Sequence, residues 1–95
     1  MRIFILEDDL KIATLIRRSL RETGFIVDHV ASGLDAFHMV SIDIYDAAIV
    51  EIMIPGLDGQ SRIESMREHG LNAPVLILCV EQSIDSRFKG LQTYP

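Results

Sequence analysis

An apolar run that ends in one acid and then turns is the feature that most restricts the fold of this chain. Residues 47–50 are all apolar, Glu51 follows them, and a Pro55-Gly56 turn comes shortly afterwards. An apolar segment of this kind is typical of a strand that is covered on both faces of a parallel sheet. The turn would leave Glu51 near the carboxyl end of the strand, the edge at which open α/β sheets bind their ligands.

A second acidic group follows another apolar run. Residues 2–6 lead directly into Glu7, Asp8 and Asp9. If the two strands are parallel neighbours, three or four carboxylates share one small space. Such a cluster either binds a hard divalent cation such as Mg²⁺ or repels itself. Helix capping is the simpler alternative, although one cap needs only one of the three acids.

Apolar runs separated by amphipathic segments predict a sheet whose strands alternate with helices. Four strands are expected, at residues 2–6, 25–30, 47–50 and 75–79. Helical spacing predicts three helices between them, and a fourth that begins at Ser83 with Ile84, Phe88 and Leu91 on one face. Short alternation of this kind implies parallel pairing through right-handed crossovers.

Charge and composition restrict the possible partners. The formal net charge of the 95 residues is −5, whereas binding to nucleic-acid phosphates requires a basic face. Three arginines in the first helix are interpreted as a solvated face near its carboxyl end, not as a binding patch: Arg17, Arg18 and Arg21. The histidines, His29, His38 and His69, lack ligand spacing and are expected at the surface.

Localisation follows from what the sequence lacks. A single cysteine cannot form an intramolecular disulfide, acids appear too early for a secretory signal, and no apolar run approaches the ~18 residues of a membrane span. We therefore expect one cytoplasmic domain with no membrane contact and no direct nucleic-acid partner.

In the order and spacing of these motifs the chain resembles the receiver domain of bacterial two-component response regulators. The resemblance is carried by the acidic pair Glu7-Asp8 after the first strand and by the turn Pro55-Gly56-Leu57-Asp58-Gly59 after the third. It covers essentially the whole chain. It implies a flavodoxin-like, three-layer α/β/α fold with a parallel sheet of strand order 2-1-3-4. A complete receiver adds a fifth strand and helix, so we expect residues 1–95 to form a truncated receiver whose sheet ends at strand four.

The resemblance also implies roles for the acidic residues. In the family an Asp at the end of the third strand accepts a phosphoryl group beside Mg²⁺, and Glu51 holds that acceptor position here. Asp8 matches a direct ligand of the cation, and Glu7 matches the acid that acts through water. The backbone carbonyl of Met53 matches the main-chain ligand. The expected cation site therefore consists of Glu7, Asp8, Glu51 and Met53.

Three departures from the family pattern weaken the case for phosphorylation. Glu51 is one methylene longer than Asp, which moves its carboxylate toward the place of a phosphoryl group. Cys79 stands at the switch position, where the family has a hydroxyl, and a thiol is a weak hydrogen-bond donor. The branched Val80 follows it. The family's lysine is absent, because the only lysines, Lys11 and Lys89, fall on expected helices.

The first functional hypothesis is a degenerate, non-enzymatic receiver that acts as a protein interaction module in two-component signalling. Glu51 is then either an imperfect mimic of phospho-Asp or a leftover carboxylate in a decayed site. A second hypothesis is a receiver that still accepts phosphate, on Asp8 or Asp9. A third is a fragment of a longer response regulator whose output domain is absent. The expected partners are a histidine kinase or an output protein.

A homodimer is the last expectation. With no fifth strand, residues 75–78 would be an apolar edge with unpaired backbone groups, and such an edge invites pairing. Part of the apolar stripe of the first helix, including Ile16 and Leu20, would also lose its usual neighbour. Two copies could dock edge to edge or exchange the helix that begins near Ser83. Lysine at Ile77 would then weaken the association.

Overall fold

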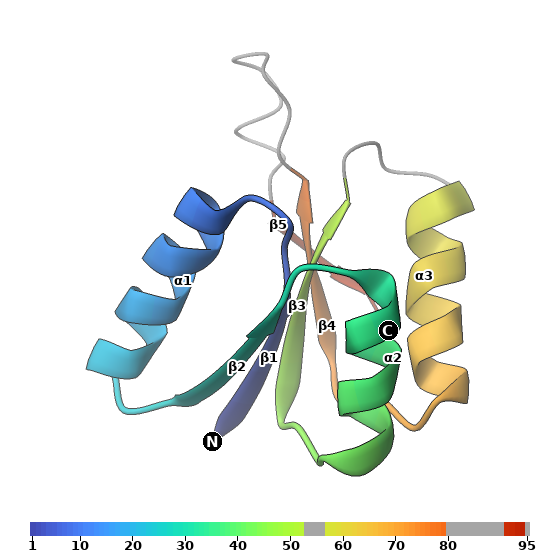
Figure 1. The fold of residues 1–95 in the computed structure, drawn as a ribbon, viewed down its shortest axis with the longest axis horizontal. Helices are drawn as coiled ribbons and strands as arrows, with labels where there is room; N and C mark the ends of the chain where they lie inside the picture. Colours follow the sequence, from blue (N-terminus) through green and yellow to red (C-terminus); the bar gives the residue numbers. More distant parts are fainter. Residues whose placement is uncertain (53–56, 80–90, 95) are drawn as a thin grey trace.

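A five-stranded sheet with helices on both faces forms the domain (Figure 1). The computed structural model describes residues 1–52, 57–79 and 91–94. The strands are β1 (Arg2–Leu6), β2 (Ile26–Val30), β3 (Ala47–Ile52), β4 (Val75–Cys79) and β5 (Leu91–Tyr94). The helices are α1 (Leu10–Glu22), α2 (Gly33–Ile42) and α3 (Leu57–Glu68). Within these ranges, no helix has the length and apolar character needed to cross a membrane.

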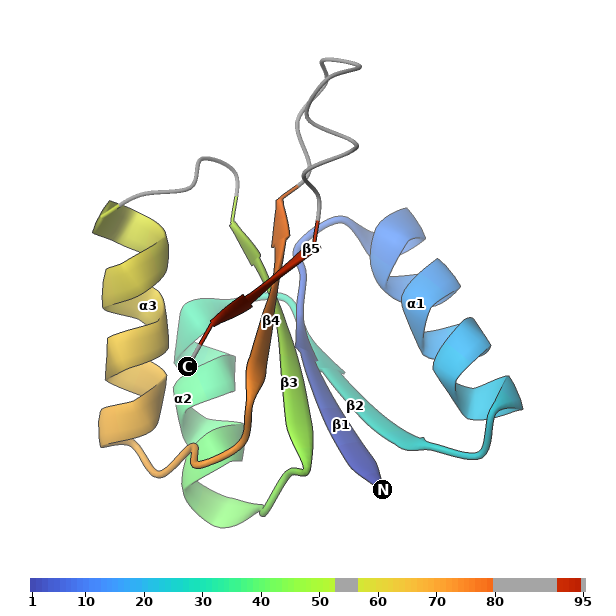
Figure 2. The same cartoon turned by 180° about the vertical axis from the view of Figure 1, so that it is seen from behind.

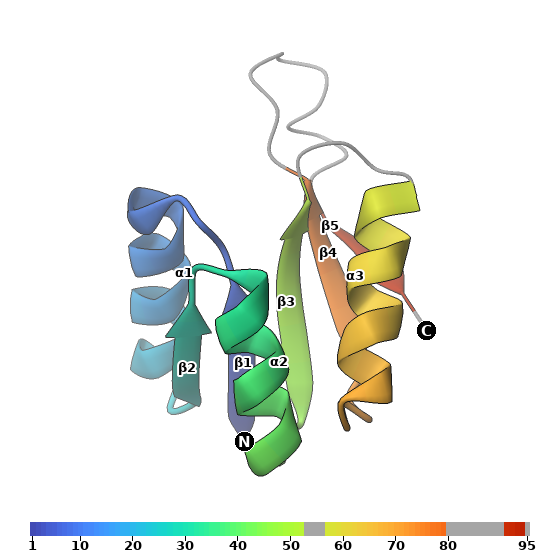
Figure 3. The same cartoon turned by 45° about the vertical axis from the view of Figure 1, so that its right-hand side comes forward.

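The first four strands are parallel and stand in the predicted order. The sheet runs β2-β1-β3-β4-β5, so the order 2-1-3-4 is confirmed. α1 lies on one face, whereas α2 and α3 lie side by side on the other (Figures 1 and 3). This is the expected three-layer α/β/α arrangement.

The apolar run of β1 supplies both hydrophobic cores, because its side chains alternate between the two faces. Phe4 and Leu6 pack in the core under α2 and α3, and Ile3 and Ile5 pack in the core under α1. All four are almost completely buried. A strand covered on both faces must be apolar at every position, which explains the uninterrupted run in the sequence.

The expectation that the sheet ends at strand four is wrong. β5 pairs with β4 in antiparallel orientation, from Leu78↔Leu91 to Val75↔Tyr94 (Figure 2). Leu91 therefore begins a strand instead of lying on the expected helix, and the remaining residues of that helix, Ser83, Ile84 and Phe88, lie outside the described residues. Antiparallel pairing satisfies the backbone groups that β4 would otherwise expose, and Thr93 and Tyr94 are residue types that favour strands.

A charged network ties the amino ends of the strands together. Arg2 bonds through Nη2 to Asp28 Oδ2 at 2.8 Å and through Nη1 to Asp43 Oδ1 at 3.3 Å. The Tyr45 hydroxyl also donates to Asp28 Oδ2, at 2.8 Å, and its ring lies under the Arg2 guanidinium. Burial raises the pKa of Tyr45, so this hydroxyl remains a donor at neutral pH. The network fixes β1, β2 and the α2–β3 connection at the end of the sheet away from the acidic residues.

The helix caps place the acidic residues. Asp9 accepts hydrogen bonds from the backbone nitrogens of Lys11 and Ile12, at 2.9 and 3.2 Å, and so begins α1. Ser32 caps α2 in the same way, because its side chain accepts a hydrogen bond from the backbone nitrogen of Asp35. Because Asp9 is the cap, Glu7 and Asp8 remain available at the end of β1.

Two glycines with positive φ end helices, but only one stands in a crowded place. Gly70 follows α3 with φ +119°, and a Cβ there would lie 3.2 Å from the carbonyl oxygen of Val40 in α2. Gly24 follows α1 with φ +100°, and a Cβ there would meet no atom within 4 Å. The ends of α2 and α3 are therefore in close contact, and the stacked rings of Phe37 and His69 lie in the same region.

We expect Gly70→Ala to destabilise the domain more than Gly24→Ala. Both changes force a side chain into a left-handed backbone conformation, at a cost of about 1 kcal/mol. Gly70→Ala adds the contact with Val40, for a total of about 2 kcal/mol. Urea unfolding followed by circular dichroism measures both variants. Equal losses of stability in the two variants would show that α2 moves away from the added Cβ at little cost in free energy.

Candidate functional site

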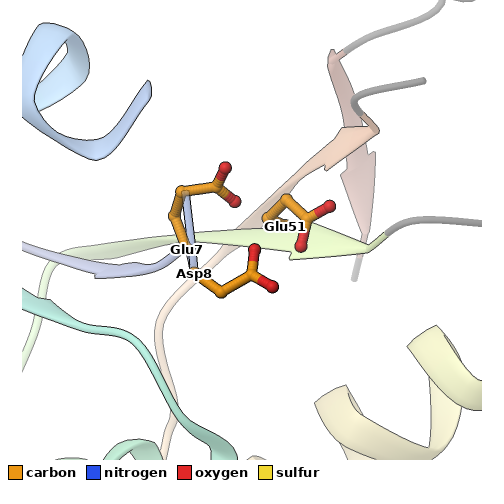
Figure 4. A group of neighbouring side chains, drawn as sticks. All are labelled: Glu7, Asp8 and Glu51. Carbon is orange, nitrogen blue, oxygen red and sulfur yellow. The ribbon is translucent and has the colours of Figure 1, made fainter. Parts of the chain in front are cut away.

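Three carboxylates converge at the carboxyl edge of the sheet. Parallel pairing of Leu6 with Val50 places the ends of β1 and β3 side by side, and the acids follow at the next positions. One oxygen from each of Glu7, Asp8 and Glu51 lies within 4.8 Å of the others (Figure 4). We call these three residues the acidic cluster.

Two members of the acidic cluster are buried. Glu7 is 2% exposed and Glu51 is 6% exposed, whereas Asp8 is exposed to solvent. Glu7 Oε2 is fully buried and has no hydrogen-bond partner within the described ranges. A buried carboxylate oxygen without a partner is costly, because desolvation is not compensated. This oxygen is therefore an independent sign that a ligand belongs in the cluster.

Burial and mutual repulsion shift the titration of both glutamates. Burial is the main cause that raises the pKa of Glu7 from 4.5 to about 7, and the charges of Glu51 and Asp8 add to it. Burial also raises the pKa of Glu51, and Asp8 adds to that rise, whereas the positive charge of Arg62 lowers it. Both carboxylates resist ionisation while no cation is present.

Two side chains contact the backbone of the acidic cluster. His29, at the carboxyl end of β2, places Nε2 2.7 Å from the carbonyl oxygen of Glu7. Arg62 of α3 donates from Nη1 to the carbonyl oxygen of Glu51 at 3.1 Å. The sequence predicts a surface position without a role for His29, whereas the residue is half-buried beside the cluster. The place of His29 at the end of strand two could have indicated that it lies near the acidic residues. For Arg62 the sequence holds no such signal, because it does not distinguish Arg62 from Arg67 on the same helix.

The other predicted site residues are described only in part. The backbone of Cys79 pairs with Ile52 at the end of β4, which brings this position to the same edge as the acidic cluster. Met53 and Val80 lie outside the described residues. The acidic cluster and the switch position therefore share one edge of the sheet.

The residues present fit a hard divalent cation. All three donors are carboxylate oxygens, the ligand type that Mg²⁺ and Ca²⁺ prefer. A cation would give the buried Glu7 oxygen a partner and would remove the repulsion that raises the pKa of both glutamates.

We expect the cation-free domain to lose stability as the pH rises from about 4.5 to about 7. Glu7 has a higher pKa in the folded than in the unfolded chain. In this pH range the native state therefore holds more protons, and the free energy of unfolding falls as the pH rises. Glu7→Gln removes this loss and should stabilise the domain by about 1–2 kcal/mol at pH 8 in EDTA.

Denaturant unfolding at pH 4, 6 and 8 measures the effect. Glu64→Gln, which neutralises an exposed glutamate of α3, is the control. The two variants should differ little at pH 4 and diverge as the pH rises. Parallel pH profiles for wild type and Glu7→Gln would contradict the raised pKa.

Comparison with known proteins gives a consistent family. The family model of the response regulator receiver domain matches residues 3–94. The chain is 39% identical over 92 residues to the probable transcriptional regulatory protein SilR of Salmonella typhimurium, covering 97% of this chain and 40% of that protein. It is 33% identical over 92 residues to the transcriptional regulatory protein CusR of Escherichia coli K12, with the same coverage of 97% and 40%. The chain thus spans about two fifths of the length of these curated relatives.

Solved structures agree with the sequence comparison. The receiver domain of the Francisella response regulator 1452 superposes with a TM-score of 0.71 at 29% identity, covering 94% of this chain and 74% of that one. The receiver domain of the sensor histidine kinase PA1611 from Pseudomonas aeruginosa PAO1, which has a magnesium ion in its active site cleft, gives 0.70 at 28% identity, with coverage of 94% and 74%. On the family match and this shared fold, the chain belongs to the response regulator receiver domains of two-component signalling.

Proposed function

We propose that this receiver is a protein interaction module whose state is set by the Glu51 carboxylate and not by a phosphoryl group. A receiver is a signalling domain, not an enzyme. The observation that supports the proposal is the placement of Glu51, which is 6% exposed at the end of β3 with its carboxylate beside those of Glu7 and Asp8. The acceptor position of this receiver thus carries a permanent acidic group.

The chemistry of Glu51 argues against efficient phosphoryl transfer. Its extra methylene shifts the nucleophilic oxygen, and ångström-scale misplacement can cost ~100-fold in a positioned reaction. Burial and Asp8 raise its pKa, which reduces the fraction of the ionised nucleophile. The switch position holds Cys79 in place of the family's hydroxyl, and a thiol is a weak hydrogen-bond donor to a phosphoryl oxygen.

We propose Mg²⁺ as the cation of this domain, held by Glu7, Asp8 and Glu51. The Met53 carbonyl is a further proposed ligand that lies outside the described residues. The unpartnered Glu7 oxygen supports the site, and so does the magnesium ion in the cleft of the PA1611 receiver. When bound, such a cation supplies positive charge that neutralises the carboxylates.

The partners proposed are a histidine kinase or an output protein in the cytoplasm. The curated relatives are named as transcriptional regulators, and the chain matches about two fifths of their length. A receiver that forms part of a longer regulator is therefore a second candidate, and its output would be control of transcription. Both candidates use the receiver surface for protein contacts.

The homodimer stays a prediction, but the argument from an unpaired β4 edge no longer supports it. β5 pairs with β4, so no unpaired β4 edge remains, and Ile77 is 7% exposed in the core under α2 and α3. Lysine at Ile77 would disrupt this core and could not report on an interface. The remaining support is Leu76 and Leu78, which are half-buried on the face that, among the described helices, only α1 covers. Light scattering at tens of micromolar protein should show a dimer mass, and a folded monomer would refute the prediction.

The test of the proposed function is intact mass after exposure to acetyl phosphate and Mg²⁺. We expect no stable phosphate on wild type under conditions that label an ordinary receiver in parallel. Glu51→Asp shows whether the extra methylene alone blocks the reaction or whether Cys79, in place of the family's hydroxyl, does so as well. A gain of one phosphate mapped to Glu51 would overturn the proposal. Phosphate mapped to Asp8 or Asp9 would favour a receiver that accepts phosphate at another acid.

A further inference from the structure

His29 lies beside the acidic cluster, at the carboxyl end of β2. Its Nε2 atom is 2.7 Å from the carbonyl oxygen of Glu7. Because a carbonyl oxygen can only accept, Nε2 carries the proton of this hydrogen bond. The residue is half-buried, so water competes with the bond only in part. His29 therefore supplies a directed donor to the backbone of the first acid.

This bond extends the contact between β1 and β2 beyond the paired residues. The last pair is Leu6 with Val30, and the Glu7 amide donates to the carbonyl oxygen of Val30 at 3.1 Å. Evenly spaced bonds in a parallel ladder would next take a donor from residue 32, but β2 ends at Val30 and Ser32 caps α2. The side chain of His29 takes the place of that donor, so both the amide and the carbonyl of Glu7 are held from β2.

The carbonyl that His29 contacts belongs to the peptide group that joins two members of the acidic cluster. A peptide group is planar, so fixing its oxygen limits the orientation of Glu7 and Asp8 together. Both residues contribute a carboxylate oxygen to the cluster, where one oxygen from each member lies within 4.8 Å of the others. One hydrogen bond from β2 thus restrains two of the three donors.

We propose that His29 is a positioning residue of the cation site, which holds the Glu7–Asp8 peptide group in the orientation that Mg²⁺ requires. Mg²⁺ demands near-octahedral oxygen ligands, whereas Ca²⁺ accepts a more flexible geometry. A restraint on the donors therefore favours Mg²⁺ over Ca²⁺. This selectivity rests on the proposed function, because it needs the cation in the acidic cluster, whereas the hydrogen bond of His29 does not.

Three variants of His29 separate its donor from its bulk. His29→Gln keeps a donor, because the amide nitrogen of Gln is as many bonds from Cα as Nε2 of His. His29→Asn carries the same amide on a shorter side chain, which cannot reach as far. His29→Leu removes the donor. His38→Leu makes the same change at an exposed histidine of α2 and is the control.

Cation affinity is measured by the shift of the unfolding midpoint with Mg²⁺ or Ca²⁺, each variant against its own value in EDTA, so that a general loss of stability cancels. We expect His29→Leu and His29→Asn to bind Mg²⁺ roughly tenfold more weakly than wild type and to lose less affinity for Ca²⁺. His29→Gln and His38→Leu should bind both cations like wild type. Unchanged Mg²⁺ affinity in His29→Leu, equal losses for the two cations, or no rescue by His29→Gln would each overturn the proposal.

A second measurement follows the hydrogen bond without a cation. Hydrogen exchange of the Glu7 amide in EDTA reports how often the end of β1 opens away from β2. This exchange should be roughly fivefold faster in His29→Leu than in wild type and unchanged in His29→Gln. The same rate in His29→Leu and wild type would show that His29 does not hold the backbone of Glu7.

The two measurements separate this inference from the proposed function. If neither Mg²⁺ nor Ca²⁺ stabilises wild type, the cation part of the proposed function is wrong, and the selectivity assigned to His29 is wrong with it. Hydrogen exchange would still decide whether His29 fixes the Glu7–Asp8 peptide group. If the cations do stabilise wild type and His29→Leu binds them equally well, the cation site stands and the role of His29 is refuted.

Discussion

Repulsion between buried carboxylates is the constraint on which the functional edge of this domain depends. It arises from topology, because parallel pairing of β1 with β3 brings the residues that follow Leu6 and Val50 to the same place. Glu7 and Glu51 are both almost fully buried there, and neither can be ionised without cost. The fold holds the acids together against this cost. A positive charge at this edge, from a bound cation or from the chain itself, would reduce the repulsion between them.

Packing and ion pairs in the rest of the domain offset the destabilising repulsion between the carboxylates at this edge. β1 is buried on both faces, and its four apolar side chains join two cores that anchor the residues just before Glu7. At the opposite end, Arg2 connects Asp28 and Asp43 across strands and loop. The contacts of Arg2 lie at the end of the sheet away from the acidic cluster, whereas the two cores hold the strand that leads into it. A local edge of low stability on a rigid frame is a common arrangement for elements that respond to ligands.

The first four strands of the sheet could be predicted from the sequence, because a strand buried on both faces leaves a continuous apolar run. The strand order came from the family resemblance and is confirmed. The fate of the chain after β4 could not be predicted from local pattern. Leu91 lies seven residues after Ile84, a spacing that indicates a helix, but it begins a strand. Its pairing with β4 joins segments that are distant in the sequence, and helical spacing carries no information about such contacts.

In the candidate site, too, some residues could be predicted from local sequence and others could not. Glu7, Asp8 and Glu51 were predicted because each follows an apolar strand, and a strand end is a position that topology fixes. Arg62 was missed because a long side chain on a helix surface reaches its partner through rotamers, and nothing in the pattern of α3 marks which arginine turns toward β3.

A receiver with Glu51 differs from an ordinary receiver in how negative charge reaches the acceptor position. A phosphoryl group would add about two negative charges only when a partner delivers it. A glutamate carries at most one charge, always present in the chain, and its ionisation depends on what lies next to it. Burial and Asp8 raise the pKa of Glu51 and so disfavour the charged form, and the positive charge of Arg62 opposes that rise only in part. If Glu51 sets the state of the domain, the charges that surround its carboxylate take the place that phosphate transfer has in an ordinary receiver.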